Sequence, residues 1–238
     1  MYQEIRKRKG FSRVKHFLLD LFFPITCFGC DKSETHLCFK CFKRLKFLEH
    51  DNLKLLEKNN LSAIFIAGNY QNKLLAKLII AFKYNNIKGL GYNLAQFLNF
   101  FWEGKIKTLE FEDKKLAATF KDILVVPIPL SKKRMRERSF NQSEILAYFF
   151  CQEFSYQLFL GLKRKATRRN QAQLRADRRK KNIKDSFFCD MKDLRMIRSR
   201  NVLLIDDVIT TGATLNEAAA TLLSLGAKKV YALVLARA

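Results

Sequence analysis

The sequence contains no apolar stretch long enough to cross a membrane. The longest candidate near the amino end, residues 17–25, follows a basic stretch as a signal peptide would, but Asp20 interrupts it and Pro24 ends it. A membrane-spanning helix needs about 20 consecutive apolar residues, and no small-residue cleavage site follows this run. We therefore expect an amphipathic helix here, in a cytoplasmic protein without a transmembrane segment.

Acidic residues are also scarce, because 22 Asp and Glu stand against 45 Lys and Arg, for a net charge of +23. This imbalance favours a polyanionic partner, most simply nucleic acid. Glycine and proline are few in a chain rich in Lys, Asn and Phe, which leaves biased codon usage open as a second explanation of the charge. Codon bias explains the clustering poorly, since the cations gather in residues 6–9, 132–138 and 163–184.

A hydrophobic content of 48% excludes a disordered chain, and 238 residues suffice for one α/β domain with a small attachment. Helical patterns separate several short apolar runs, and this alternation predicts a parallel sheet flanked by helices. Residues 103–121 carry mixed charges and are expected to form a surface excursion. The basic segment 163–184 is expected to be an exposed loop or helix. The predicted strands are residues 63–67, 123–129, 156–160, 202–205 and 229–235.

Four of the six cysteines form two Cys-x2-Cys pairs, Cys27 with Cys30 and Cys38 with Cys41. Thiolates at this spacing can surround one tetrahedral zinc ion, leaving no open position for catalysis. Disulfides and a redox dithiol are alternatives, but no secretion signal is visible and a redox site needs only one pair. We predict a structural zinc site within an N-terminal module, residues 1–60, followed by an α/β domain, residues 61–238.

The most informative stretch is residues 202–214. An apolar strand ends in Asp206 and Asp207, and a small hydroxylated loop then opens a helix. Gly212 permits close approach and the helix start adds positive charge, so backbone N–H groups can surround a phosphate. Two carboxylates beside a phosphate require ribose hydroxyls or magnesium, which predicts a sugar-phosphate ligand. The alternative is a plain helix start with Thr214 as N-cap and Glu217 completing a capping box. The phosphate-binding residues are expected to be Thr210, Thr211, Gly212, Ala213 and Thr214.

This stretch resembles the diphosphosugar signature of type I phosphoribosyltransferases, and the whole chain resembles the ComF family of competence proteins. Where that family has glycine, this chain has Ser139. This serine carries a Cβ and must still adopt the backbone conformation that glycine allowed. The resemblance rests on the motif Phe-Pro-x2-Cys-x2-Cys at residues 23–30, the second cysteine pair, Phe82-Lys83-Tyr84, Val126-Pro-Ile-Pro129, Arg138-Ser-Phe-Asn-Gln142, the series Gln171, Leu174, Arg179 and Asn182, and the signature itself.

The resemblance implies a type I phosphoribosyltransferase-like fold and a role for each matching residue. Asp206 and Asp207 would contact the ribose hydroxyls of phosphoribosyl diphosphate, as the catalytic pair, and residues 210–214 would hold its 5′-phosphate. Magnesium would accompany the diphosphate. The remaining implied residues are Arg134 and Arg138, in the basic loop after Pro129 and near the diphosphate, and Gln171 and Arg179, in a flexible loop that closes over the site.

The resemblance also implies a function, namely a competence protein acting in DNA uptake and natural transformation. It would bind single-stranded DNA and phosphoribosyl diphosphate in the cytoplasm. Two alternatives stay open: a salvage-type phosphoribosyltransferase with an unidentified acceptor, and an adaptor that binds other uptake or recombination proteins through the zinc module. No group of residues in the sequence identifies a nucleobase pocket, so enzymatic activity is left open.

Overall fold

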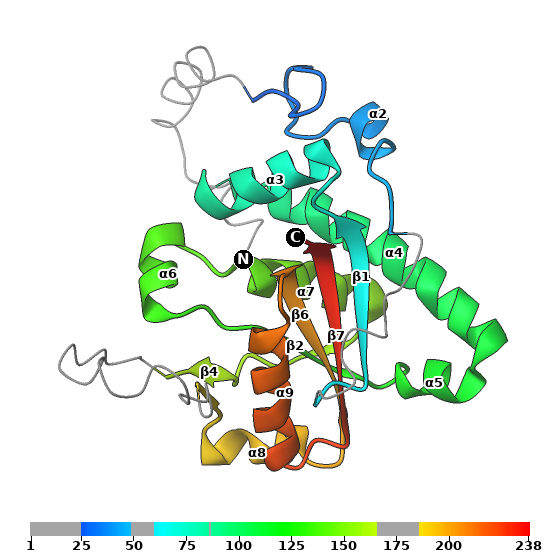
Figure 1. Cartoon of the computed structure of the whole chain (residues 1–238), viewed down its shortest axis with the longest axis vertical. Helices are drawn as coiled ribbons and strands as arrows, with labels where there is room; N and C mark the ends of the chain where they lie inside the picture. Colours follow the sequence, from blue (N-terminus) through cyan, green and yellow to red (C-terminus); the bar gives the residue numbers. More distant parts are fainter. Residues whose placement is uncertain (1–24, 49–59, 86, 166–185) are drawn as a thin grey trace, which may run out of the picture. The chain divides into compact units, whose positions relative to one another are not determined.

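The computed structural model of the protein describes residues 25–48, 60–85, 87–165 and 186–238 (Figure 1). The described residues divide into two compact units between Arg44 and Leu45, ahead of the division predicted at residue 60. The helix predicted over residues 17–25 and most of the basic segment, including Gln171 and Arg179, lie outside the described residues.

The described part of the first unit, residues 25–44, is built from turns and the short helix α2 (Phe39–Phe42). A bridge joins Thr26 to Ser33, and the N–H of Asp31 donates to the carbonyl of Cys27 at 2.9 Å. Among residues 25–44 the buried side chains are Cys27, Leu37 and Cys41. These few apolar groups form a small core, which a bound metal would stabilise.

The second unit contains a five-stranded sheet in which every neighbouring pair is parallel, as predicted. A separate antiparallel pair, β4 (Lys163–Arg164) and β5 (Phe187–Phe188), flanks residues 166–185. The large sheet places the predicted signature strand at its centre (Figure 1). Its order is β1 (Ala63–Asn69), β7 (Lys229–Arg237), β6 (Asn201–Ile209), β2 (Leu124–Pro127) and β3 (Gln157–Leu158).

Helices cover both faces of this sheet (Figure 1). α4 and α7 pack against each other and against the sheet, while α9 contacts β7. Capping follows sequence signals: the Asn72 side chain accepts from the N–H groups of Leu74 and Leu75, and the Asn141 side chain accepts from that of Ser143. The helices are α3 (Lys73–Tyr84), α4 (Leu90–Glu112), α5 (Lys114–Thr119), α6 (Lys132–Arg138), α7 (Gln142–Phe154), the 3-10 helix η4 (Met191–Asp193), α8 (Leu194–Ile197) and α9 (Ala213–Ser224).

The core has two different halves because strand side chains alternate between faces. On one side Ile64 and Ile66 of β1 belong to an aliphatic cluster with Leu222 of α9. On the other side the ring of Phe65 meets Trp102 of α4 edge to face, with centroids 5.2 Å apart. The aromatic half continues from Phe120 to Tyr231, at 4.9 Å.

Two sequence predictions about surface segments are wrong. Residues 103–121 are not an excursion, because α4 continues to Glu112 and α5 follows, with Leu109 and Phe120 buried. The many charged residues of this segment lie on its outward side. In the sequence they obscure the pattern of the few apolar residues that pack inward. The basic stretch after Pro129 is also not a loop but the helix α6, capped by Ser131, whose Oγ accepts from the N–H of Arg134 at 3.3 Å.

Candidate functional site

The acidic pair lies on β6, which continues past the predicted end at Ile205 and reaches Ile209. Asp207 is buried, and its Oδ1 lies 2.9 Å from Nζ of Lys83, the penultimate residue of α3. Its Oδ2 lies 3.9 Å from Nη1 of Arg138, the last residue of α6. Two cations from different helices therefore neutralise this carboxylate.

Arg138 is held in place from several directions. Its Nη1 donates to Gln142 Oε1 at 3.3 Å, and Gln142 Nε2 donates to the carbonyl oxygen of Phe82 at 3.3 Å. The guanidinium carbon lies 5.3 Å from the ring centroid of Tyr84, within cation–π range. Ser139 then ends α6 with φ of +62°, so it adopts the left-handed conformation that glycine takes more readily.

Asp206 has a different environment. Its Oδ1 accepts from Ser143 Oγ at 2.8 Å and from the N–H of Asp207 at 2.9 Å. Burial raises the pKa of Asp206 to about 7, and repulsion from Asp207 adds to this, although the hydrogen bonds from Ser143 and the Asp207 N–H and the charge of Lys83 oppose it. Asp206 therefore takes up a proton near neutral pH, while Asp207 keeps its two cationic neighbours.

The loop after β6 has the form of an anion site. Gly212 is the N-cap of α9 and has φ of +74°, a conformation that strains residues with a Cβ. The first N–H groups of α9 lack partners within the helix, and its amino end carries partial positive charge. The alternative with Thr214 as N-cap is wrong, because Gly212 is the cap and Glu217 instead accepts from the N–H of Ser186 at 2.7 Å.

These elements enclose one cavity of about 280 Å³. It brings together nine of the residues singled out in the sequence, and Gln171 and Arg179 lie outside the described part of the chain. Lys83, Tyr84 and Arg164 line the cavity too, although no role for them was predicted from the sequence. Cations, the two carboxylates and the loop before α9 line this cavity together: the lining includes Lys83, Tyr84, Arg134, Arg138, Arg164, Asp206, Asp207, Thr210, Thr211, Gly212, Ala213 and Thr214.

The donor set suits a phosphorylated sugar with a magnesium ion. Backbone N–H groups at a helix start suit a terminal phosphate, and arginine and lysine suit a diphosphate. Carboxylate oxygens can accept from ribose hydroxyls or serve as hard ligands for Mg²⁺. The residues present therefore fit these groups in chemical type.

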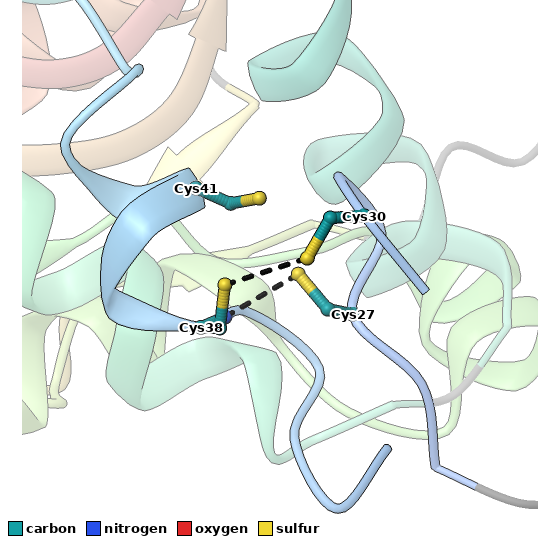
Figure 2. Close-up of side chains that lie close together, drawn as sticks. All are labelled: Cys27, Cys30, Cys38 and Cys41. Atoms are coloured by element: carbon teal, nitrogen blue, oxygen red, sulfur yellow. Dashed lines mark hydrogen bonds between the residues drawn. The ribbon is translucent and has the colours of Figure 1, made fainter. Parts of the chain in front are cut away.

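The predicted metal ligands come together in the first unit (Figure 2). The four sulfur atoms of Cys27, Cys30, Cys38 and Cys41 all lie within 4.8 Å of one another, and those of Cys30 and Cys38 are 3.6 Å apart. A tetrahedron with Zn–S bonds of about 2.3 Å has edges of about 3.8 Å, so the cluster fits zinc closely. All four cysteines are free thiols.

Hydrogen bonds prepare Cys27 for this role. The N–H of Cys38 donates to Cys27 Sγ at 3.4 Å. Burial raises the pKa of Cys27, but backbone hydrogen bonds from Cys38 and Gly29 and the neighbouring thiols outweigh it and lower the pKa to about 6. Hydrogen bonds to the sulfur atom favour the thiolate that a metal requires.

Known proteins resemble this chain over most of its length. Residues 143–238 match the phosphoribosyl transferase domain, which covers α7, the cavity loop and the strands β6 and β7. The chain is 30% identical over 221 residues to Competence protein F of Haemophilus influenzae, covering 89% of this chain and 90% of that protein. The chain belongs to the ComF family of phosphoribosyltransferase-like proteins.

Other relatives of this ComF-family protein match over shorter stretches. The DNA utilization protein YhgH of Escherichia coli is 35% identical over 118 residues, 48% of each chain. Competence protein ComFC of Bacillus subtilis is 36% identical over 106 residues, 44% of this chain and 40% of that protein. Within the described residues of this ComF-family protein, none of the helices has the length and apolar character needed to span a bilayer.

Proposed function

We propose that this ComF-family protein binds phosphoribosyl diphosphate with Mg²⁺ in the cavity beside β6, and that it handles single-stranded DNA during uptake. The proposal takes the DNA role from relatives whose names refer to competence and to DNA utilization. It takes the ligand from the phosphoribosyl transferase domain and from the cavity. We place both activities in the cytoplasm, where incoming single strands would meet the protein.

One observation carries the ligand assignment, namely the arrangement of opposite charges around the cavity. The acidic pair of β6 lines the same cavity as the amino end of α9 and cations supplied by α3, α6 and β4. Inorganic phosphate has no sugar hydroxyls to donate to the acidic pair, whereas ribose hydroxyls can donate to it. A ligand with phosphate at one end, hydroxyls in the middle and diphosphate at the other end uses all three groups.

In this arrangement residues 210–214 hold the 5′-phosphate, and Asp206 and Asp207 accept from the ribose hydroxyls. Arg134, Arg138 and Lys83 face the diphosphate. Magnesium, when bound with the diphosphate, would neutralise part of its negative charge. The protein's own contribution is to orient the sugar between the loop and the carboxylates.

The DNA assignment is supported by charge. The chain carries +23 overall, and in the described part Lys132, Lys133 and Arg136 of α6 are exposed. Single-stranded DNA offers one negative charge per nucleotide, so binding should release counterions and weaken steeply with salt. Each neutralised phosphate contributes a log–log slope of about −0.7.

Two binding measurements test the proposal. Isothermal titration with phosphoribosyl diphosphate should give saturable binding in Mg²⁺ that the double change Asp206→Asn with Asp207→Asn abolishes. Anisotropy of a labelled oligonucleotide should show affinity that falls with salt. A slope near zero would remove the electrostatic argument for DNA. Release of diphosphate in a screen of nitrogen acceptors, without DNA binding, would identify a salvage transferase instead.

A further inference from the structure

The helix α2 of the first unit exposes an aromatic side chain among cations. Phe39 is 73% exposed, and Lys40, Lys43 and Arg44, which follow it in or just after α2, are exposed as well. Phe42, at the other end of the same helix, is only half-exposed. Phe39 is therefore not part of the small core of this unit.

The position of Phe39 is defined by its neighbours. It directly follows Cys38 and precedes Cys41 by two residues, so two of the four clustered cysteines bracket it. The N–H of Lys43 donates to the Phe39 carbonyl at 3.1 Å, which closes the helical turn. Nζ of Lys43 lies 4.3 Å from the Phe39 ring centroid. The ring is thus exposed on a short helical turn between two of the clustered cysteines, with the ammonium group of Lys43 beside it.

The chemistry of the surroundings indicates what this ring contacts. A docking surface for an apolar partner would surround Phe39 with further apolar side chains, whereas here the exposed neighbours on the turn are cations. In the described part of this unit, the acidic residues are Asp31 and Glu34, in the turns before the helix. Exposed aromatic rings among Lys and Arg are the arrangement by which proteins bind single-stranded nucleic acid, with bases stacked on rings and phosphates near cations.

We propose that Phe39 stacks on a nucleobase of single-stranded DNA while Lys40, Lys43 and Arg44 contact the neighbouring phosphates. This inference rests on the proposed function, since it takes single-stranded DNA as the ligand. It adds a specific contact, on the cysteine-rich unit and apart from the residues that line the sugar-phosphate cavity. Stacking needs only the face of a base, so the contact would tolerate any sequence.

The test separates stacking from charge by using two oligonucleotides of equal length, one of deoxythymidine and one abasic. Both carry the same phosphates, but only the first offers bases. The full-length, zinc-loaded chain should bind the deoxythymidine strand more tightly. Phe39→Ala should weaken that binding roughly 5- to 150-fold, the range expected for loss of one stacked base, and leave the abasic strand unaffected.

The matched control is Phe111→Ala, because Phe111 is 90% exposed on α4 of the second unit. It should leave both affinities unchanged. Phe39→Trp should keep the preference for bases and report stacking by quenching of the new indole, against the buried Trp102 as background. Lys43→Gln should weaken both strands equally and reduce the salt slope by about 0.7.

The outcomes distinguish this inference from the function on which it rests. If the unaltered chain binds neither strand, the proposed DNA function fails and the stacking contact with it. If the unaltered chain prefers the deoxythymidine strand and Phe39→Ala keeps that preference with full zinc content, only the stacking contact is overturned. Equal losses for Phe39→Ala and Phe111→Ala would also overturn it.

Discussion

Lys83 Nζ lies 2.9 Å from Asp207 Oδ1, and the two side chains are only 12% and 9% exposed. The pair joins the end of α3 to the central strand at a place where water cannot easily replace either partner. Breaking a buried ion pair by removing one member leaves an uncompensated charge, which costs more than a surface pair contributes. The cavity beside β6 is thus partly built from an interaction that also stabilises the fold.

Lys83→Met should therefore lower the free energy of unfolding by about 3 kcal/mol and weaken phosphoribosyl diphosphate binding. Adding Asp207→Asn should recover part of the lost stability, because it removes the buried carboxylate that would otherwise keep only the more distant Arg138 as a cationic partner. Urea denaturation of the four members of this double-mutant cycle measures the coupling. Additive losses would show that the two groups do not interact appreciably in solution.

Gln142 connects Arg138 to the Phe82 carbonyl and is completely buried. Gln142→Leu should cost about 1–3 kcal/mol, since it removes the partners of two buried groups, and should loosen Arg138 in the cavity. Gln152→Leu on the same helix is the control, because Gln152 is exposed and bonds only to the hydroxyl of Tyr148. Equal changes in melting temperature and in ligand affinity for the two variants would contradict this role for Gln142.

The environment of Asp206 predicts a pH dependence of stability. Burial is the largest cause that raises its pKa to about 7 in the folded protein, whereas in the unfolded chain the carboxyl titrates near 4. The folded state therefore holds a proton that the unfolded state releases, so this contribution is present below about pH 4 and lost as pH rises to about 7.

Asp206→Asn should remove this contribution and flatten the fall in stability between about pH 4 and pH 7. Urea denaturation at several pH values in this window measures the slope for both proteins. The Ser143 hydroxyl can still donate to the side-chain oxygen of asparagine, so the fold should persist. An unchanged slope in the variant would assign the pH dependence to other groups.

Two glycines on helices should respond in opposite ways to alanine. At Gly212 the positive φ should make Gly212→Ala destabilising by about 1–2 kcal/mol and should hinder phosphate approach. Gly104 lies within α4 with open space where a Cβ would stand, so Gly104→Ala should stabilise by about 0.5–1 kcal/mol. Melting temperatures that shift in the same direction for both would count against the assigned conformation of Gly212.

The cysteine cluster predicts one zinc ion per chain. Cys27→Ser should lower the zinc content measured by atomic absorption, because it removes one of four sulfur ligands. Cys189→Ser is the control, since Cys189 lies outside the cluster and should leave zinc bound. Equal zinc content in both variants would contradict the four-cysteine site. A chelator should unfold the first unit if metal binding stabilises its fold.

Sequence reasoning succeeded wherever the interacting groups are close along the chain. The cysteine pairs, the apolar run of β6 with its two aspartates, and the helix start at Gly212 are each contained within short segments. It failed for residues 103–121, where a few buried side chains such as Phe120 decide the packing and many charges mask them. It also could not tell that Asp206 and Asp207 have different environments, since both are adjacent and chemically identical.

The sequence by itself determined the five strands of the parallel sheet, the four-cysteine cluster and the loop before α9, because periodicity and ligand spacing are local properties. Only the tertiary structure decided the partners of the acidic pair. Lys83 and Ser143 reach Asp207 and Asp206 because α3 and α7 end and begin beside the carboxyl end of the central strand. The order of the parallel strands brings these side chains into contact, and no short stretch of sequence encodes those contacts.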